Sequence, residues 1–449
     1  MIPLKLNDLA KVLNCPAPPR DAEIQHILTD SRKVVSGTLF AALPGEHFDG
    51  HDFAADAAGL GAVALLVERR QEVEVPQLVV DDVLAALGKI AALLRDRIDP
   101  KVAGITGSNG KTTVKEMVAA ILALEGDVLA TQGNFNNELG LPLTLFQLEQ
   151  KHRFAVLEMG ASKSGDIAYL ASIGQPDVGL VNNSAPAHLE GFGSIEGVAR
   201  TKGEMFAALP ANGCAVMNAD ESWLDLWRGM NNAGTTLTFG AAEGSDVRLE
   251  ESAGGSNLLT PAGEIELKLA LPGRHNLMNA AAATAIALAM DVSMDTIRQG
   301  LERVQPVPGR LNLLHTAAGW TVIDDTYNAN PASLYSALQV LSQIPGESWL
   351  VLGDMKELGM DSSKMHREVG ENARVMGIKR LFATGEMSEH TVDMFGRGAV
   401  HFETREELVR ALRRQVRPGV NLLVKGSRSM RMESVVEAIV QESEMREAS

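Results

Sequence analysis

Short apolar runs alternate with longer amphipathic segments along most of the chain. In QLVVDDVLAALGKIAALLRD (77–96), an apolar run of strand type passes into a segment with the periodicity of an amphipathic helix. Similar runs precede helical patterns at KVAGITG (101–107), FAVLEMG (154–160) and DVGLVNN (177–183). Strands that alternate with helices in this way are typical of α/β domains with parallel sheets. We therefore predict an α/β fold throughout.

Interruptions of this pattern divide the chain into three predicted domains. A chain of 449 residues exceeds what one hydrophobic core usually organises, so two or three domains are expected. The pattern changes near residue 83 and again at the turn-rich QPVPGRLN (305–312), where prolines and a glycine interrupt the regular elements. The predicted domains are therefore residues 1–82, 83–312 and 313–449.

The carboxyl ends of the predicted strands indicate where a ligand binds. In open parallel sheets, ligands collect at that edge of the sheet. Strand-type runs of the third domain end in Asp, Gly or Ser, as in WTVIDD (320–325), SWLVLGD (348–354), RLFATG (380–385) and NLLVKGS (421–427). We therefore expect a ligand-binding cleft between the second and third domains.

Composition and charge exclude several classes of protein. The formal net charge of −16 argues against non-specific nucleic-acid binding, which needs clustered positive charge. Cys15 and Cys214 are too few and too far apart for a disulfide framework, which fits a reducing compartment. The longest apolar stretch, AAAATAIALAM (280–290), is too short to span a bilayer and predicts a buried helix. We expect a cytoplasmic protein that is not an integral membrane protein.

The stretch GITGSNGKTT (104–113) predicts a phosphate-binding loop, or P-loop. Its glycines let backbone N–H groups approach phosphate oxygens, and a helix N-terminus follows them. Lys111 is placed to reach the β- and γ-phosphates, and Thr112 to ligate Mg²⁺. The spacing is a variant, because Ile105 stands where the common pattern has its first glycine. The alternative is a strand-to-helix loop that needs glycines only for its geometry.

Polar residues further along the second domain add candidate chemistry. Glu158 ends an apolar strand, where a carboxylate needs solvent, an ion pair or a metal ion; beside a P-loop, a metal ion is favoured. His188 follows a strand end within a loop rich in polar groups, so it is either a functional or a structural histidine. Lys202 lies on a helical pattern, and its spacing alone does not assign it a role.

Asparagines and an arginine near the third domain are further candidates. Asn276 and Asn279 lie at the start of the alanine-rich helix, where an asparagine either caps the helix or contacts a purine. Arg310 lies at the predicted joint, where a guanidinium could close on a γ-phosphate. The segment DDTYNANP (324–331) has more polar groups directly after a strand than a plain turn requires.

These motifs, taken in order, resemble the Mur ligases, a family of ATP-dependent enzymes that add amino acids to the peptidoglycan precursor, with folylpolyglutamate synthase as a more distant relative. The family's own P-loop variant accounts for the irregular glycine spacing. The motifs that carry the resemblance are DSRKVVSGTLFAALPGEHFDGH (30–51), GITGSNGKTT (104–113), TQGNFNNELGLP (131–142), LEMGAS (157–162), AHLEGFGSIEGVARTKGE (187–204), LPGRHNLMNAAAA (271–283), DDTYNANPAS (324–333), LGDMKELG (352–359) and VKGSRSMRME (424–433).

The resemblance implies a role for each domain. Residues 1–82 would be a small α/β domain that binds a UDP-sugar, and residues 83–312 a central P-loop ATPase-like domain with a parallel sheet that binds ATP. Residues 313–449 would be a Rossmann-like domain that binds an incoming dipeptide and closes on ATP. The expected cleft would then lie between the central and C-terminal domains.

The resemblance also implies site residues. Thr112 and Glu158 would hold one Mg²⁺ and His188 a second, with Lys202 converted by CO₂ to a metal-facing carbamate. Lys111 would join Glu158, His188 and Lys202 as a catalytic group. The residues implied in ATP binding are Gly107, Ser108, Asn109, Gly110, Lys111, Thr112, Thr113, Asn276, Asn279, Arg310 and Asp325. Those implied in binding the other substrates are Ser31, Arg32, Asp49, His51, Asn136, Asn137, Asn328, Asn330, Lys425 and Ser427.

The activity implied is amide-bond formation between D-alanyl-D-alanine and UDP-N-acetylmuramoyl-tripeptide through an acyl phosphate, by a monomer. A sister ligase of the family or a folylpolyglutamate-type enzyme is the nearest alternative. The diamino-acid signature Asp-Asn-Pro-Arg of the tripeptide-forming ligase is absent from the sequence, which argues against the preceding step. A P-loop switch that binds nucleotide without forming a bond is the alternative from another class.

Overall fold

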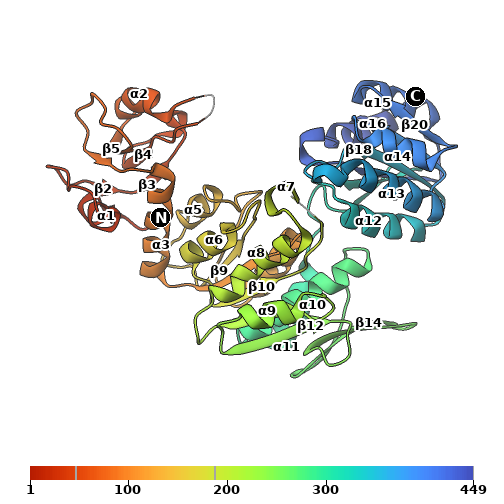
Figure 1. The fold of residues 1–449 in the computed structure, drawn as a ribbon, viewed down its shortest axis with the longest axis horizontal. Coiled ribbons are helices and arrows are strands. Elements are labelled where there is room, and N and C mark those ends of the chain that lie inside the picture. The colour runs from red at the N-terminus through yellow and green to blue at the C-terminus, as the bar shows by residue number, and fades with distance from the viewer. Residues whose placement is uncertain (46–47, 187–188, 448–449) are drawn as a thin grey trace.

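The computed structural model describes residues 1–45, 48–186 and 189–447. Its strands form separate sheets in three consecutive parts of the chain, with the N-terminal and C-terminal parts at opposite ends of the molecule and the central part between them (Figure 1). Each sheet has helices packed against it, which gives the layered arrangement of α/β domains. The predicted α/β fold is confirmed.

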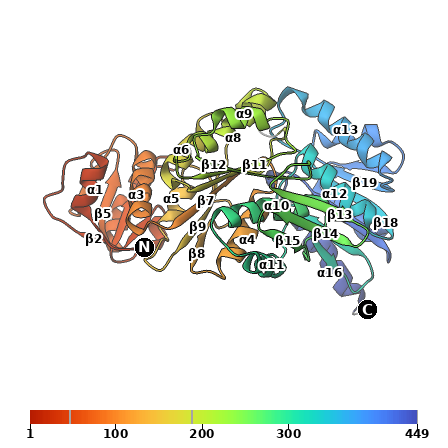
Figure 2. The same ribbon diagram turned by 90° about the horizontal axis from the view of Figure 1, so that it is seen from below.

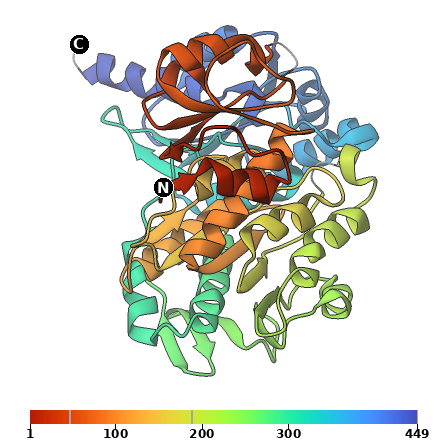
Figure 3. The same ribbon diagram turned by 90° about the vertical axis from the view of Figure 1, so that its left-hand side faces the viewer.

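The N-terminal part is a small parallel sheet with a separate two-stranded ribbon. In the sheet, β3 (His26–Leu28), β4 (Thr38–Ala41), β5 (Ala62–Val67) and β6 (Gln77–Val79) follow one another in space as in sequence. The ribbon pairs β1 (Leu4–Lys5) with β2 (Glu23–Ile24). The helices are α1 (Leu6–Leu13), α2 (Ala54–Gly59) and α3 (Val83–Ile98), which leads into the central sheet. Figure 3 views the molecule from this end.

The central sheet places the P-loop strand third from one of its edges. Its order is β15-β14-β13-β12-β11-β10-β7-β9-β8, with parallel pairing from β13 to β8 and antiparallel pairing from β13 to β15. The strands are β7 (Lys101–Thr106), β8 (Val128–Ala130), β9 (Phe154–Glu158), β10 (Val178–Val181), β11 (Cys214–Asn218), β12 (Thr235–Gly240), β13 (Val247–Ser252), β14 (Gly255–Thr260) and β15 (Gly263–Glu266). The antiparallel extension was not predicted.

Helices cover both faces of the central sheet. Successive strand residues point to opposite faces, and both sets are apolar here, so each face needs a covering layer. In β7, Val102 packs into one core and Ala103 and Ile105 into the other. Figure 2 shows α6, α8 and α9 on one side of the sheet and α4, α10 and α11 on the other. The helices of the central part are α4 (Lys111–Leu122), α5 (Gly140–Leu145), α6 (Asp166–Gly174), α7 (Leu189–Phe192), α8 (Ile195–Ala207), α9 (Leu224–Met230), α10 (Arg274–Ala289) and α11 (Met294–Arg303).

The C-terminal sheet is parallel except at one edge. Its order is β16-β17-β21-β18-β19-β20, and β16 is antiparallel to β17. The strands are β16 (Asn312–His315), β17 (Thr321–Asp325), β18 (Glu347–Gly353), β19 (Arg380–Thr384), β20 (Ala399–Phe402) and β21 (Val420–Lys425). The helices are α12 (Pro331–Gln343), α13 (Ser362–Val375), α14 (Ser388–Phe395), α15 (Arg405–Gln415) and α16 (Glu433–Glu447). Across the described residues, no helix combines the length and the hydropathy needed to cross a membrane.

Candidate active site

A cleft of about 680 Å³ lies where the carboxyl ends of the central strands face the C-terminal sheet. The loop after β7, the end of β9 and the start of α10 line its central side, and the segment from β17 into α12 lines the opposite side. Of the predicted site residues, the following line the cleft: Gly107, Ser108, Asn109, Gly110, Lys111, Thr112, Thr113, Asn136, Glu158, Lys202, Asn276, Asn279, Arg310, Asp325, Asn328, Asn330 and Lys425.

The loop between β7 and α4 has the backbone of an anion-binding site. Gly110, at a φ of 80°, precedes the first residue of α4, so the helix N-terminus points into the cleft. A Cβ at Gly110 would lie 2.5 Å from Asn182 Nδ2 and 2.5 Å from Asn279 Oδ1, so this position accepts only glycine. The loop can therefore lie against both asparagines. Because the Ser108 and Asn109 N–H groups donate to Asn183, phosphate oxygens would meet the N–H groups at the start of α4.

Lys111 supplies a positive charge at the same point. Its Nζ donates a hydrogen bond to the Gly107 carbonyl at 2.7 Å, across the loop that it follows. Burial lowers the pKa of Lys111, the Glu158 carboxylate opposes that shift, and the Arg310 guanidinium adds to it. A bound polyphosphate would neutralise this repulsion between cations, which favours an anionic ligand here.

Oxygen donors suited to Mg²⁺ lie beside the loop. Glu158, only 2% exposed at the end of β9, accepts hydrogen bonds of 2.7 Å from Thr112 Oγ1 and Asn136 Nδ2. Arg310 Nη2 donates to the same Thr112 oxygen at 2.8 Å, so a cationic group already lies against it. Hydroxyl and carboxylate oxygens are ligands that Mg²⁺ accepts, with water and phosphate oxygens completing the octahedron. The residues present therefore fit this metal ion.

Lys202 lies on α8 and is 4% exposed. Burial lowers its pKa well below the ordinary value, and the positive charge of Lys111 lowers it further. Its Nζ is 6.0 Å from the centre of the Phe192 ring. A lowered pKa increases the share of the neutral amine, the form that reacts with CO₂, so the environment is compatible with the predicted modification. His188 lies outside the described residues.

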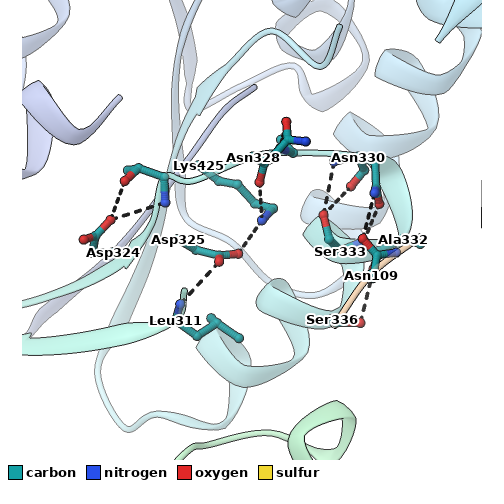
Figure 4. A network of polar contacts seen from close by, with 12 residues as sticks. Asn109, Leu311, Asp324, Asp325, Asn328, Asn330, Ala332, Ser333, Ser336 and Lys425 are labelled. Atoms are coloured by element: carbon teal, nitrogen blue, oxygen red, sulfur yellow. Dashed lines mark hydrogen bonds and ion pairs between the residues drawn. The ribbon is translucent and has the colours of Figure 1, made fainter. Parts of the chain in front are cut away.

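The C-terminal side of the cleft presents a buried ion pair (Figure 4). Lys425 at the end of β21 donates hydrogen bonds to the Asp325 carboxylate and, at 2.9 Å, to the Asn328 carbonyl. Burial raises the pKa of Asp325, and Lys425 opposes that rise. The Leu311 N–H donates to Asp325 at 3.3 Å, so this carboxylate also holds the joint between the domains.

Of the predicted residues that the structure describes, six lie outside the cleft lining. Asn137 accepts a hydrogen bond from the Gly140 N–H, and Ser427 Oγ accepts one from the Lys356 N–H. The other four belong to the N-terminal domain and are Ser31, Arg32, Asp49 and His51. Asn276 and Asn279 do not cap α10, because its N-cap is Gly273.

The N-terminal residues form their own polar cluster. Arg32 makes two hydrogen bonds of 2.9 Å to Asp30. His51 Nδ1 lies 2.6 Å from one Asp49 oxygen, and Arg69 donates to the other at 2.6 Å. His51 Nε2 accepts from the Glu68 N–H, so both ring nitrogens of this buried histidine are engaged within the domain. A ligand would therefore meet the more exposed Asp49 and Arg69 rather than the imidazole.

Family models match all three parts of the chain. The Mur ligase middle domain matches residues 105–287, the glutamate ligase domain of the Mur ligases matches residues 309–428, and the catalytic domain of the Mur ligase family matches residues 23–95. The chain belongs to the Mur ligase family.

Relatives within the Mur ligase family match almost the full length. The UDP-N-acetylmuramoyl-tripeptide–D-alanyl-D-alanine ligase of Escherichia coli (strain K12) is 42% identical over 451 residues, which covers 98% of this chain and 99% of the relative. The enzyme of the same name from Bacillus subtilis (strain 168) is 34% identical, with 93% of each chain covered.

Solved structures of Mur ligases share the fold. A crystal structure of MurF from Acinetobacter baumannii has a TM-score of 0.91 at 35% identity and covers 98% of this chain and 99% of its own. The crystal structure of MurF from Thermotoga maritima in complex with ADP has a TM-score of 0.86 at 32% identity, with 94% and 98% covered.

The cleft of this Mur ligase also contains residues that the sequence did not indicate as site residues. Asn182 and Asn183 follow β10, and Glu221 follows β11, so the strand-end rule that identified Glu158 could have identified them too. His275 stands at the start of α10, and burial, then the charge of Lys425, lowers its pKa to about 4. Only the folded arrangement brings His275 near that lysine from the C-terminal sheet.

Proposed function

We propose that this Mur ligase uses ATP to join D-alanyl-D-alanine to UDP-N-acetylmuramoyl-tripeptide, giving UDP-N-acetylmuramoyl-pentapeptide, ADP and phosphate. The observation that carries the proposal is the cleft itself, where a P-loop, a buried carboxylate and a buried lysine face the C-terminal sheet. Full-length identity to ligases of this name supports the choice of substrates. The reaction belongs to peptidoglycan precursor synthesis in the cytoplasm, and we propose that the enzyme acts as a monomer.

The chemistry explains why ATP is needed. A carboxylate reacts poorly with an amine, because it is anionic and its oxygen is a poor leaving group. The tripeptide's terminal carboxylate attacks the γ-phosphorus of ATP, ADP leaves, and an acyl phosphate forms. The free amine of D-alanyl-D-alanine then attacks the acyl carbon, and the tetrahedral intermediate expels phosphate as the amide bond forms. The amine also loses a proton in this second step.

Residues on the central side hold the phosphates. The loop N–H groups and Lys111 bind the β- and γ-phosphates, and Arg310 reaches the γ-phosphate from the joint. Thr112 and Glu158 would hold one Mg²⁺, and His188 and a carbamylated Lys202 a second. Bound Mg²⁺ offsets the charge of the triphosphate and stabilises the transferring phosphoryl group. Asn276 and Asn279 lie on the adenine side, and Asp325 reaches the ribose.

The predicted domains then take distinct roles. Residues 1–82 bind the UDP-sugar, residues 83–312 bind ATP, and residues 313–449 bring the dipeptide to the acyl phosphate. Because water would hydrolyse that intermediate, the domains close around it, with hinges near residues 83 and 312. X-ray scattering tests the closure: profiles that superimpose with and without ATP analogue plus sugar nucleotide would contradict it.

Phosphate release with defined substrate pairs tests the function. UDP-N-acetylmuramoyl-tripeptide with D-alanyl-D-alanine gives amine-dependent phosphate release, whereas the UDP-dipeptide with a diamino acid, or a folate with glutamate, gives only background. No release with the first pair would overturn the proposal. Release with the second or third pair alone would assign the chain to a sister activity, and hydrolysis independent of any amine would favour a nucleotide switch.

A further inference from the structure

The N-terminus of α12 touches the P-loop. Asn330 is the N-cap of this helix: its Oδ1 accepts from the Ser333 N–H at 2.9 Å, and Ser333 Oγ accepts from the Asn330 N–H at 3.1 Å. This reciprocal capping box fixes the direction of the Asn330 side chain. Its Nδ2 donates to Asn109 Oδ1 at 2.8 Å, which joins the C-terminal domain to the phosphate-binding loop (Figure 4).

Asn109 is held equally firmly from the other side. Its N–H donates to Asn183 Oδ1 at 2.8 Å, and its carbonyl accepts from Asn182 Nδ2 and Asn183 Nδ2, each at 3.0 Å. These bonds fix the backbone of Asn109 and leave its side chain to reach α12. The contact between the domains therefore joins a pre-positioned amide on Asn330 to a side chain whose backbone is fixed, which limits the freedom lost when it forms.

The amide contacts continue beyond the P-loop. Asn182 Nδ2 also donates to Asn279 Oδ1 at 3.0 Å, Asn279 Nδ2 donates to Asn276 Oδ1 at 3.2 Å, and Asn276 Nδ2 donates to the Pro272 carbonyl at 2.7 Å. A chain of amides therefore runs from α12 across the P-loop to the start of α10. Asn182 donates to both the Asn109 carbonyl and Asn279, and Asn279 and Asn276 each donate and accept, so these contacts connect the P-loop to the start of α10.

We propose that the Asn330–Asn109 hydrogen bond is an interdomain latch, and that Asn330 is a positioning residue rather than a substrate contact. The latch sets the C-terminal domain on the P-loop in the register that brings the acceptor amine to the acyl phosphate. The effect of the latch on catalysis rests on the proposed function, whereas its effect on the position of the C-terminal domain does not. Through this hydrogen bond, a change in the conformation of the P-loop changes the position of the C-terminal domain, and the reverse also holds.

Two substitutions break the latch from opposite sides. Asn330→Ser keeps an oxygen that caps α12 but is too short to reach Asn109. Asn109→Ala removes the acceptor and keeps the backbone hydrogen bonds of the loop. Thr404→Ala is the matched control, because it removes the N-cap of α15, in the same domain, whose contacts are with α16, β19 and β20.

Steady-state kinetics give the first test. Each latch variant lowers kcat/KM for D-alanyl-D-alanine by about 3- to 10-fold, the range for one hydrogen bond between neutral groups. The double variant is no worse than the poorer single variant, because both changes remove the same contact. Thr404→Ala matches the unmodified enzyme. Losses that multiply in the double variant, or an Asn330→Ser enzyme with unchanged kinetics, would overturn the proposal.

X-ray scattering gives the second test, without turnover. With a non-hydrolysable ATP analogue, and without it, both latch variants have a larger radius of gyration than the unmodified protein and the Thr404→Ala control. Profiles that superimpose across all four proteins in both conditions would overturn the latch. If the substrate pair released no phosphate, the proposed function would fail, and scattering would still decide whether the latch exists.

Discussion

The cleft and the N-terminal domain each contain a cluster of charged groups, but water reaches the two clusters differently. In the cleft, Glu158 and Lys202 are 2% and 4% exposed. In the N-terminal cluster, the Arg69 side chain is 58% exposed and that of its partner Asp49 is 30% exposed. Burial raises the pKa of Glu221 in the cleft to about 6, whereas Arg69 and then His51 hold the pKa of Asp49 well below its usual range.

This difference in exposure predicts that the cleft residues act in catalysis and that the N-terminal cluster acts in substrate binding. Where water is excluded, a charge interacts strongly with its neighbours, and each group can stabilise a transition state. Where water and salt reach an ion pair, that pair contributes at most about 1 kcal/mol. We therefore expect substitutions in the cleft to reduce turnover, and substitutions in the N-terminal cluster to weaken substrate binding.

The largest expected effect is at Lys111. Lys111→Ala removes a buried cation that binds the transferring phosphate, and we expect turnover to fall by about 10²- to 10³-fold. Single-turnover phosphate release measures this loss at saturating substrates. Lys115→Ala, which removes another buried lysine of α4 outside the cleft lining, separates the loss of that charge from a general disturbance of the central domain. Phosphate release near the normal rate in Lys111→Ala would refute the role of this lysine.

Substitution of Lys202 tests whether the cleft needs a carboxylate at the position of this side chain. Lys202→Ala lowers turnover by about 10²-fold, and a short carboxylic acid such as formate restores part of it by replacing the carbamate. Lys115 is another buried lysine, and its Nζ donates to the Thr131 carbonyl. Formate should therefore not increase the turnover of Lys115→Ala. Full activity of Lys202→Ala without additive would exclude the carbamate.

The pH dependence of stability at Glu221 tests the difference between the two clusters. Its pKa is raised from 4.5 to about 6, so the ionised form lowers stability above pH 6 and has no such effect below pH 4.5. Glu221→Gln should therefore increase the free energy of unfolding by about 2 kcal/mol at pH 7.5 and leave it unchanged at pH 4.5. Urea denaturation at both values measures this.

Asp49→Asn is the opposing control for Glu221→Gln. The pKa of Asp49 is lowered, so its stabilisation is present above the unfolded pKa of 3.8 and is lost as pH falls through the folded value. We expect Asp49→Asn to be less stable than the unmodified protein at pH 7.5, and the difference to shrink in acid. If both substitutions increased the free energy of unfolding at pH 7.5, the buried and the exposed cluster would not differ in the way proposed.

The smallest expected effect is at Arg69. Arg69→Ala removes an exposed ion pair with Asp49, and we expect the KM for the UDP-sugar to rise about two- to fivefold while kcat stays the same. High salt should reduce the difference between variant and unmodified enzyme, because it screens the exposed pair. A fall in kcat with an unchanged KM would place this arginine in the chemistry instead.

The strands that the sequence predicted are those with short, continuous apolar runs. In β9 and β10 every residue is buried, which gives an unmistakable run. The strands β13, β14 and β15 are partly exposed and rich in Glu, Asn and Ser, so their antiparallel ladder left no such run. The small ribbon of β1 and β2 is too short to show periodicity. Burial on both faces is therefore what made a strand predictable.

The candidate site was predictable where its chemistry is local. The P-loop and Glu158 show themselves through glycine spacing and a charge at a strand end, and both line the cleft. Contacts between distant segments had no local signal: Asn330 lies 221 residues from Asn109, and Arg310 lies 198 residues from Thr112. Such pairs depend on how the domains pack. Family resemblance pointed to the residues, and only the fold shows which side chains meet.

The joint between α11 and β16 limits how far the two halves of the cleft can separate. Residues 304–311 are the only covalent connection there, and fully extended they would span roughly 27 Å. A domain on so short a tether meets its partner at a local concentration in the millimolar range, whatever the amount of enzyme in the cell. Reopening the cleft for product release therefore hardly slows the next encounter. If the chain were cut at this joint, the separated halves would have to find each other by diffusion.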